Sequence, residues 1–390
     1  MDITKRIELL ALFSALVASC SSTPSSEDAA KTPEISSSTI FSPSSSPTPA
    51  PRTLSIVSTG DILLHERLWA QAQRDGVDGE WDFYPQLADL EPVISSADLA
   101  LCHLETPLAE LGKGYEGFPT FNAPSQITDA ITKLGFDMCG TASNHSLDQG
   151  FSGLKRTIET LDAAGIPHTG TALSAEDASE PLIIDVPTAN GTVKVGVLSY
   201  TYGFNGFQRD SDKPWSANLI DAEAIIAEAK KARSLGAEIV IAKMHWGSEY
   251  TNKPNDFQTS IARELADSGQ IDLIDGSHTH SVQPITQLGN TPVSYSHGNF
   301  VAAQREPTTI KSEGLVTRWE FIEDESGKFS FSCVEALPTF IRDNLPVRVI
   351  DLNKALATGD YLGETKQRLE KAKSRTDETV RDLGFTKFCN

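Results

Sequence analysis

Hydrophobic positions along residues 53–345 form short β-branched runs that alternate with longer stretches of helical spacing. The short runs predict strands at residues 53–59, 98–103, 136–141, 182–186, 193–200, 238–243, 271–275, 293–297 and 315–323. The longer stretches predict helices at residues 125–134, 151–164, 221–235 and 257–268. Asn190-Gly191 is a typical hairpin turn between two of the strands. Strands that alternate with helices indicate an α/β fold with packed sheets.

The first 20 residues follow another pattern. Lys5 and Arg6 precede an apolar run at residues 9–18, and small residues lead into Cys20. A short basic region before a short apolar one is typical of a secretory signal and is too short to span a membrane. The residues before Cys20 resemble the bacterial lipobox, whose cysteine carries the lipid. We therefore expect an exported protein that lipidated Cys20 anchors to the outer face of the bacterial cytoplasmic membrane; the alternative is an ordinary signal peptide with a coincidental cysteine.

Residues 21–52 are predicted to be a disordered tether. Of the 31 residues from 21 to 51, 21 are Ser, Thr or Pro, which bury too little apolar surface to offset the entropy lost on folding. Residues 346–390 are predicted to be a C-terminal extension, with a charged helical pattern at 360–384. The predicted organisation is thus a signal peptide at 1–20, the tether at 21–52, a folded domain at 53–345 and the extension at 346–390.

The net charge of −20 limits the classes of molecule that the chain is expected to bind. A chain this acidic is a poor partner for nucleic acid, because binding to phosphates requires a positive surface. It does not exclude anionic substrates, since bound divalent cations reverse the local field.

Four cysteines remain once Cys20 is set aside, namely Cys102, Cys139, Cys333 and Cys389. An exported compartment permits disulfides, and four cysteines allow three pairings. A Cys333–Cys389 bridge and four buried thiols are both compatible with the sequence.

Metal-ligating residue types cluster just past the carboxyl ends of the predicted strands: Asp61, Glu105, Asn144, His245, His278 and His280. In α/β sheets that edge forms the ligand crevice. Two carboxylates, one amide and three imidazoles suit Mn, Fe or Zn better than Ca or Mg. Six ligands exceed what one catalytic ion uses, so we predict two divalent ions, with a carboxylate such as Asp61 between them.

Several neighbouring residues are candidates for other roles. If Asn144 binds metal, His145 faces the substrate and can protonate a leaving oxygen, with Asp148 setting its tautomer. His65, four residues after Asp61, is a further catalytic candidate. The candidates for lining the substrate pocket are Trp246, Glu249, Tyr250 and Arg305, although packing explains the two aromatic residues equally well.

These motifs together resemble a known family. They are Gly60-Asp61, Leu104-Glu105, Asn144-His145 with Asp148, His245-Trp246-Gly247, Gly276 with His278 and His280, and Gly298-Asn299-Phe300. In order and spacing they look like the CapA family of poly-γ-glutamate capsule biosynthesis proteins, whose fold is similar to that of calcineurin-like metallophosphoesterases. The resemblance implies a four-layer α/β/β/α sandwich with a C-terminal helical extension, around a dinuclear centre held by the six residues above. It also implies that His145 is the acid.

The chain departs from the wider phosphoesterase pattern. Leu63 stands where that superfamily has a histidine, Leu104-Glu105 replaces Gly-Asp, and the acid after Asn144-His145 is displaced to Asp148. Two functions follow from the resemblance. One is a metal-dependent hydrolase that acts on a phosphoester, or on a capsule or cell-envelope polymer, beside membrane-bound capsule synthesis proteins. The other is a non-catalytic assembly factor that binds such a polymer.

Overall fold

A computed structural model describes residues 50–304, 309–342 and 344–389 of the chain. The described residues form two sheets, and the larger one begins with β1 (Thr53–Ile62). Its strand order is β14-β13-β12-β1-β2-β3-β4, and β11 pairs with β1. The strands that follow β1 are β2 (Leu99–Leu104), β3 (Met138–Gly140), β4 (His168–Thr169), β11 (Asn299–Val301), β12 (Glu313–Glu323), β13 (Phe329–Arg342) and β14 (Arg348–Asp351). β1 to β4 run parallel, whereas β12 to β14 add an antiparallel edge.

The second sheet has the order β5-β6-β7-β8-β10-β9. Its strands are β5 (Leu182–Thr188), β6 (Gly191–Thr201), β7 (Ile239–His245), β8 (Leu273–Ser277), β9 (Ile285–Leu288) and β10 (Thr291–Ser294). β6, β7, β8 and β10 are parallel, and β5 and β6 form the hairpin predicted around Asn190-Gly191.

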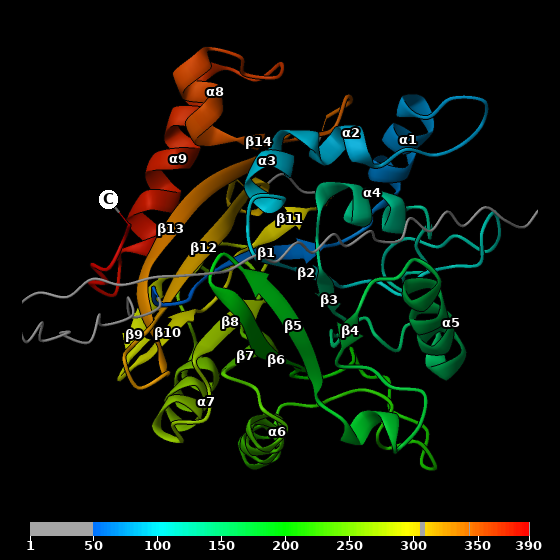
Figure 1. Cartoon of the computed structure of the whole chain (residues 1–390). Coiled ribbons are helices and arrows are strands. Elements are labelled where there is room, and N and C mark those ends of the chain that lie inside the picture. The colour runs from blue at the N-terminus through cyan, green and yellow to red at the C-terminus, as the bar shows by residue number, and fades with distance from the viewer. Residues whose placement is uncertain (1–49, 305–308, 343, 390) are drawn as a thin grey trace, which may run out of the picture. The chain divides into compact units, whose positions relative to one another are not determined.

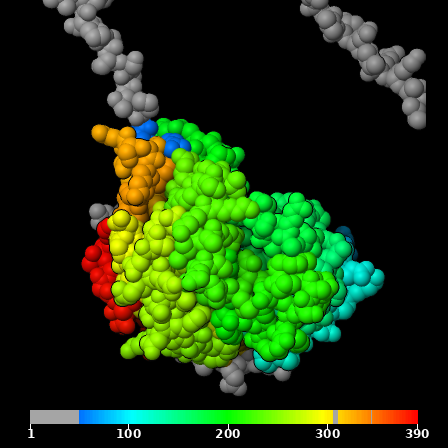
Figure 2. Space-filling view, turned by 90° about the horizontal axis from the view of Figure 1, so that it is seen from below, coloured from blue at the N-terminus to red at the C-terminus, as the bar shows by residue number. Residues whose placement is uncertain are grey.

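The two sheets pack face to face, and helices cover their outer faces (Figure 1). Leu54 and Leu101 of the first sheet share one apolar core with Val195 and Ile241 of the second. The outer face of the first sheet is covered by α1 (Glu66–Asp75), α2 (Tyr84–Leu87), the 3-10 turn η1 (Ala88–Leu90), α3 (Glu91–Ile94), α4 (Ile127–Leu134) and α5 (Gly150–Ala163). The outer face of the second is covered by α6 (Ala222–Ser234) and α7 (Asp256–Asp267), on the side that Figure 2 presents in green and yellow-green. This order of layers confirms the α/β/β/α expectation.

The C-terminal residues join the first sheet. After β14 come α8 (Leu352–Thr358) and α9 (Lys366–Val380), which lies within the stretch predicted to be helical. Leu352 and Leu369 from these helices pack on Phe340 of β13 and Ile350 of β14. The shorter turns η2 (Asp177–Ser179) and η3 (Thr309–Ser312) complete the elements.

The four cysteines form two disulfides, Cys102–Cys139 and Cys333–Cys389. The first joins β2 to β3, and the second ties the end of the chain to β13. The structure thus selects one of the three pairings that the sequence left open.

Several sequence predictions lie outside the described residues: the signal segment, residues 21–49 of the tether, Cys20 and Arg305. Arg52, the last residue of the predicted tether, is described and forms ion pairs with Glu238 and Glu323. Within the described residues, no helix has the length and apolar character needed to cross a membrane.

β1 continues three residues past its predicted end at residue 59, which corrects the position of Asp61. Asp61 lies within β1 and pairs with Asn299 of β11. His245, also expected past a strand end, is the last residue of β7. Gly60 permits the extension, because a Cβ there would lie 1.9 Å from the carbonyl oxygen of Gly298. A backbone approach this close requires glycine.

Candidate metal centre

The six predicted ligands come together at one edge of the sandwich, where β1, β2, β3, β7 and β8 end. Each is at most 3% exposed: Asp61, Glu105, Asn144, His245, His278 and His280. Parallel strands bring their carboxyl ends to the same edge, so residues far apart in the chain meet there.

His245 lies within reach of both carboxylates. Its Nε2 is 2.9 Å from Oδ1 of Asn144 and 3.8 Å from Oε1 of Glu105. Its Nδ1 is 3.6 Å from Oδ1 of Asp61. The two nitrogens of His280 lie 3.8 Å from Oδ2 of Asp61 and 4.0 Å from Oε1 of Glu105.

Glu105 is common to two groups of potential ligands. Ligand atoms of Glu105, His245 and His278 lie within 4.8 Å of one another, as do those of Asp61, Glu105 and His280. Both carboxylate oxygens of Glu105 are buried and have no hydrogen-bond partner among the described residues. In Asp61, only Oδ1 is buried without a hydrogen-bond partner among the described residues, because Oδ2 accepts the N–H of His278 at 3.0 Å. Glu105 therefore has the two free oxygens that a bridging carboxylate needs, and Asp61 has one.

Unpaired buried oxygens are a test of whether metal ions fit. Buried polar atoms in folded proteins nearly always have partners. Here the Oε atoms of Glu105, Oδ1 of Asp61 and Nδ1 of His278 are buried without one in the described part of the chain. Divalent cations would satisfy these atoms, and the mixed nitrogen and oxygen donors suit Mn, Fe or Zn. The residues fit a metal centre.

Burial also sets the charge of the ligands. It lowers the pKa of His280 to about 3 and lowers the pKa values of His245 and His278 as well. The imidazoles are therefore neutral at pH 7, the form that binds metal. Burial raises the pKa of Asp61 to about 7, and burial together with the nearby Asp61 raises the pKa of Glu105. Two buried carboxylates beside neutral imidazoles favour the binding of cations.

Further contacts fix the orientation of the histidine rings. Asn299 Oδ1 lies 2.9 Å from Nδ1 of His280, which leaves Nε2 of that ring free. Ser277 Oγ lies 3.1 Å from Nδ1 of His245. His278 and His280 both have positive φ angles, 92° and 52°. Such conformations are uncommon outside glycine and occur where the surrounding structure imposes them, often at functional sites.

His145 and Asp148 form the pair that the sequence predicted. Nδ1 of His145 lies 2.7 Å from Oδ2 of Asp148, which also accepts the N–H of Phe121 at 2.7 Å. The ring of Phe121 lies edge-on to the His145 ring at 4.8 Å. Asp148 thus holds the proton on Nδ1 and leaves Nε2 available to a substrate.

His65 lies beside this pair but outside both ligand groups. Its Nδ1 accepts the N–H of Ala303 at 3.3 Å, and its ring packs edge-on against Phe121 at 5.4 Å. Burial lowers its pKa to about 4. His65 is therefore a neutral histidine that packs beside the site.

The rim of the centre carries aromatic and charged side chains. Tyr250 stacks on His280 at 5.8 Å, and Tyr202 lies 4.5 Å from the His278 ring. Both tyrosines are 41% exposed. Glu249 is exposed beside Tyr250, and its charge raises the pKa of that phenol together with burial. The Nζ of Lys311, in η3, lies 3.9 Å above the Tyr250 ring.

The structure decides between the two interpretations of Trp246 in favour of packing. Its side chain is fully buried in the core between β7 and the helices α6 and α7. Its Nε1 donates to the carbonyl of Tyr295 at 3.0 Å. Trp246 directly follows β7 and packs with Ala242 and Met244. The side chains of these two residues alternate with that of His245 and so lie on the opposite face of the strand.

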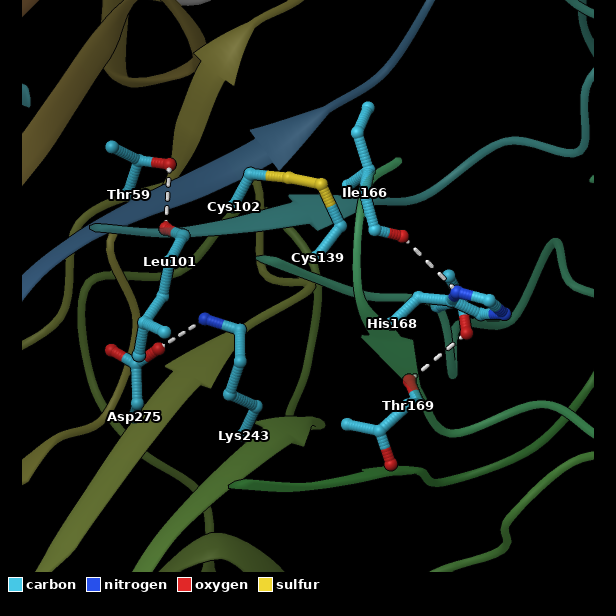
Figure 3. Close-up of a disulfide and its surroundings, with 10 residues drawn as sticks. Thr59, Leu101, Cys102, Cys139, Ile166, His168, Thr169, Lys243 and Asp275 are labelled. Carbon is cyan, nitrogen blue, oxygen red and sulfur yellow. Dashed lines mark hydrogen bonds and ion pairs between the residues drawn. A yellow bond between two sulfur atoms is a disulfide. The ribbon is translucent and has the colours of Figure 1, made fainter. Parts of the chain in front are cut away.

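Figure 3 shows a disulfide and a buried ion pair on strands that lead to the ligands. Lys243 of β7 and Asp275 of β8 form a fully buried ion pair, two residues before His245 and three before His278. The Cys102–Cys139 bridge joins β2 and β3 just before the residues that lead to Glu105 and Asn144.

Sequence reasoning missed Asn299, Tyr202, Lys311 and His103. Asn299 belongs to a quoted motif, but nothing in its spacing indicated that it holds His280. Tyr202 and Lys311 reach the rim only through tertiary packing. His103 had a detectable signal, since it is a histidine in an otherwise apolar strand two residues before Glu105.

Fold and site together define the class: a two-sheet α/β sandwich with a buried His, Asp and Glu cluster suited to metal ions. Residues 55–304 match the family described as "Bacterial capsule synthesis protein PGA_cap", so the chain belongs to that family.

Among curated relatives, the chain is 27% identical over 310 residues to the PGA biosynthesis protein CapA of Bacillus subtilis, covering 76% of each protein. It is 28% identical over 270 residues to the capsule biosynthesis protein CapA of Bacillus anthracis, covering 67% of this chain and 63% of that protein.

Among solved structures, the calcineurin-like phosphoesterase YfkN of Bacillus subtilis is similar with a TM-score of 0.47 and 16% identity. That comparison covers 86% of this chain and 99% of the other.

Proposed function

We propose that this protein acts in the synthesis, anchoring or processing of a poly-γ-glutamate-like capsule or cell-envelope polymer, as a metal-dependent hydrolase of the phosphoesterase type. The single observation that carries the proposal is that Glu105, whose two carboxylate oxygens are buried and have no hydrogen-bond partner among the described residues, belongs to two groups of histidine and carboxylate ligands. Family membership supplies the capsule context.

The ligands divide between two positions. One draws on Glu105, Asn144, His245 and His278, and the other on Asp61, Glu105 and His280. Ions bound there would polarise a phosphoryl or acyl oxygen and lower the pKa of a water molecule.

The protein's own groups supply orientation and proton transfer. Asp148 holds His145 with Nδ1 protonated, so the Nε2 side can deliver or accept a proton at the scissile bond. Asn299 and Ser277 hold His280 and His245 in fixed orientations. At the rim, Lys311 provides a positive charge close to the centre, which suits an anionic substrate.

The chain is further proposed to work at the outer face of the cytoplasmic membrane, held by lipidated Cys20. The signal-like residues 1–20 and the Ser/Thr/Pro-rich segment that follows support this placement. Membrane-bound capsule synthesis proteins are proposed partners at that surface.

The test combines metal analysis with turnover. Protein purified with Mn, Fe or Zn should retain close to two ions by mass spectrometry and hydrolyse a generic phosphoester or shorten poly-γ-glutamate chains. His278→Ala and Asn144→Ala should lose metal, whereas the control His168→Ala should retain it, because His168 is a half-buried residue of β4 outside the cluster. Metal retention with polymer binding but without turnover on any of these substrates would favour the non-catalytic assembly factor. Absence of metal under every loading condition would refute the proposal.

A further inference from the structure

His103 is a buried histidine to which the proposed centre assigns no role. It is the fifth residue of β2 and is 1% exposed. Leu99 and Leu101, on the same face of the strand, belong to the core between the two sheets, so His103 faces that space too. Neither of its ring nitrogens has a hydrogen-bond partner in the described residues. A buried imidazole with both nitrogens unpaired is costly for the folded state.

The free nitrogens of His103 lie beside the metal ligands. The register of β1 and β2 places His103 opposite Asp61. Its Nε2 is 3.9 Å from Oδ1 of Asp61, an oxygen that also has no hydrogen-bond partner in this part of the chain. Its ring stacks on His245 at 4.8 Å with an interplanar angle of 21°. Ligand atoms of Asp61, His103 and His245 all lie within 4.8 Å of one another.

A second buried histidine shows how a purely structural imidazole is satisfied in the same protein. His297 is also fully buried near the space between the sheets. Its Nδ1 lies 3.0 Å from the carbonyl oxygen of Gly276, and its Nε2 lies 2.9 Å from Oγ1 of Thr317. Both nitrogens of His297 are paired, whereas both nitrogens of His103 are free. Hydrogen bonds within the core therefore account for the burial of His297 but not for the burial of His103.

We propose that His103 is a metal ligand on the Asp61 side of the centre. The inference rests on the proposed metal centre and adds a donor to it. The position formed by Asp61, Glu105 and His280 has three protein donors, one fewer than the position that includes Asn144. Asp61 is shared by that position and by the group with His103. Its Oδ2 lies 3.8 Å from Nδ1 of His280 and its Oδ1 lies 3.9 Å from Nε2 of His103, so an ion bound at Oδ1 would lie within reach of this further imidazole from β2.

The experiment compares His103→Gln and His103→Ala with His297→Gln in the full-length protein. Metal content and chelator competition report affinity, and the ¹H NMR spectrum of the Co²⁺-loaded protein reports ligation through hyperfine-shifted imidazole N–H signals. In the His103 variants, one ion should bind more than about 100-fold more weakly, beyond the 10–100-fold loss typical of residues that only orient a ligand. Their Co²⁺ spectra should also lack one imidazole signal.

The matched control separates ligation from packing. His297→Gln should keep the ion count and every shifted signal, while its melting temperature falls because two buried hydrogen bonds are disturbed. Should His103→Ala fold poorly, the polar His103→Gln variant carries the test. Unchanged affinity and an unchanged Co²⁺ spectrum in folded His103→Gln would overturn the ligand role alone. A wild-type protein that takes up no ion would overturn the metal centre itself.

Discussion

At the scale of single residues, the centre combines neutral imidazoles with carboxylates whose pKa values burial raises. Burial raises the pKa of Asp61 to about 7 and lowers that of His280 to about 3. The histidines are therefore ready to bind a cation at neutral pH, whereas Asp61 must first release a proton below about pH 7. This difference makes the pH dependence of metal binding informative about which groups are ligands.

Metal affinity is expected to rise with pH, and the contribution of Asp61 to that rise should level off above about pH 7. Below its pKa of about 7, Asp61 holds a proton in the metal-free protein, and an ion must displace it. The apparent affinity should increase by about tenfold per pH unit for each proton released, with little contribution from His280 because it is already neutral in this range. Chelator competition with Zn between about pH 5.5 and 8 measures the slope. Asp61→Asn should give a shallower slope, and a flat wild-type profile below pH 7 would contradict the assignment.

Proton transfer is expected to depend on His145 without affecting metal retention. His145→Gln should lower turnover by about 10²–10⁴-fold, the usual contribution of a positioned general acid or base. Asp148→Asn should also lower turnover, because the amide no longer holds Nδ1 of His145 protonated. Initial rates with a phosphoester, together with metal content, check both variants. Full activity in His145→Gln would exclude the acid role.

At the scale of elements, the site depends on how firmly neighbouring strands are joined. The Cys102–Cys139 disulfide couples β2 and β3, whose ends lead to Glu105 and Asn144. A closed loop of this length, with a sequence separation of 37, is expected to stabilise the fold by about 4 kcal/mol on the chain-entropy account.

Removing either disulfide should lower the free energy of unfolding, but only the removal of Cys102–Cys139 should weaken metal binding. The double change Cys102→Ala with Cys139→Ala is expected to cost about 4 kcal/mol and to reduce metal affinity. The control removes Cys333–Cys389, which has a separation of 56 and joins β13 to the C-terminus. Denaturant unfolding should show a similar loss for both, and chelator competition should show weaker metal binding for the first alone. Equal metal affinity in the two variants would argue against coupling between β2–β3 and the centre.

Much of the fold was predictable because its strands and helices carry clear periodicity. The Asp221 cap of α6 and the capping box of Asn255 and Gln258 at α7 give sharp boundaries near the predicted ones. The sequence did not predict the helices α1, α2, α3 and α8 or the strands β4, β9, β11, β13 and β14. α2 and α3 are four residues each, too short for a helical period to show. The burial of β13 alternates only in part along its length.

The six ligands were predictable because each lies close to the carboxyl end of a strand with strong apolar character. What the sequence could not show is which neighbours complete their hydrogen bonds. The pairing of Glu105 with two ligand groups depends on register between distant strands, and so does the approach of His103 to Asp61. The sequence left open whether Trp246 lines the pocket or packs in the core, and the structure places it in the core beside the β7 side chains that face away from His245.

At the scale of the whole molecule, the sandwich brings the ends of five strands from two sheets to one edge. The family match covers residues 55–304, which include all six ligands, while β12 to β14 and the C-terminal helices lie beyond it. The proposed anchor lies at the opposite end of the chain, at Cys20. Anchoring and metal binding are therefore expected to be separable.

Replacing Cys20 tests the proposed anchor directly. Cys20→Ser should move the protein from the membrane fraction to the soluble fraction, because the acylated cysteine would be lost. The released protein should bind as much metal as wild type. Cell fractionation and metal analysis check the two outcomes, and continued membrane association of Cys20→Ser would count against lipidation.

The central claim is that the buried cluster is a two-ion centre bridged by Glu105, and anomalous X-ray diffraction tests it most directly. Crystals of the metal-loaded protein, measured on either side of the Mn, Fe or Zn absorption edge, should show two anomalous peaks about 3.5–4 Å apart. One peak should lie within ligand distance of Glu105 and His278, and the other within ligand distance of Glu105 and Asp61. No anomalous peak in contact with Glu105 would contradict the account.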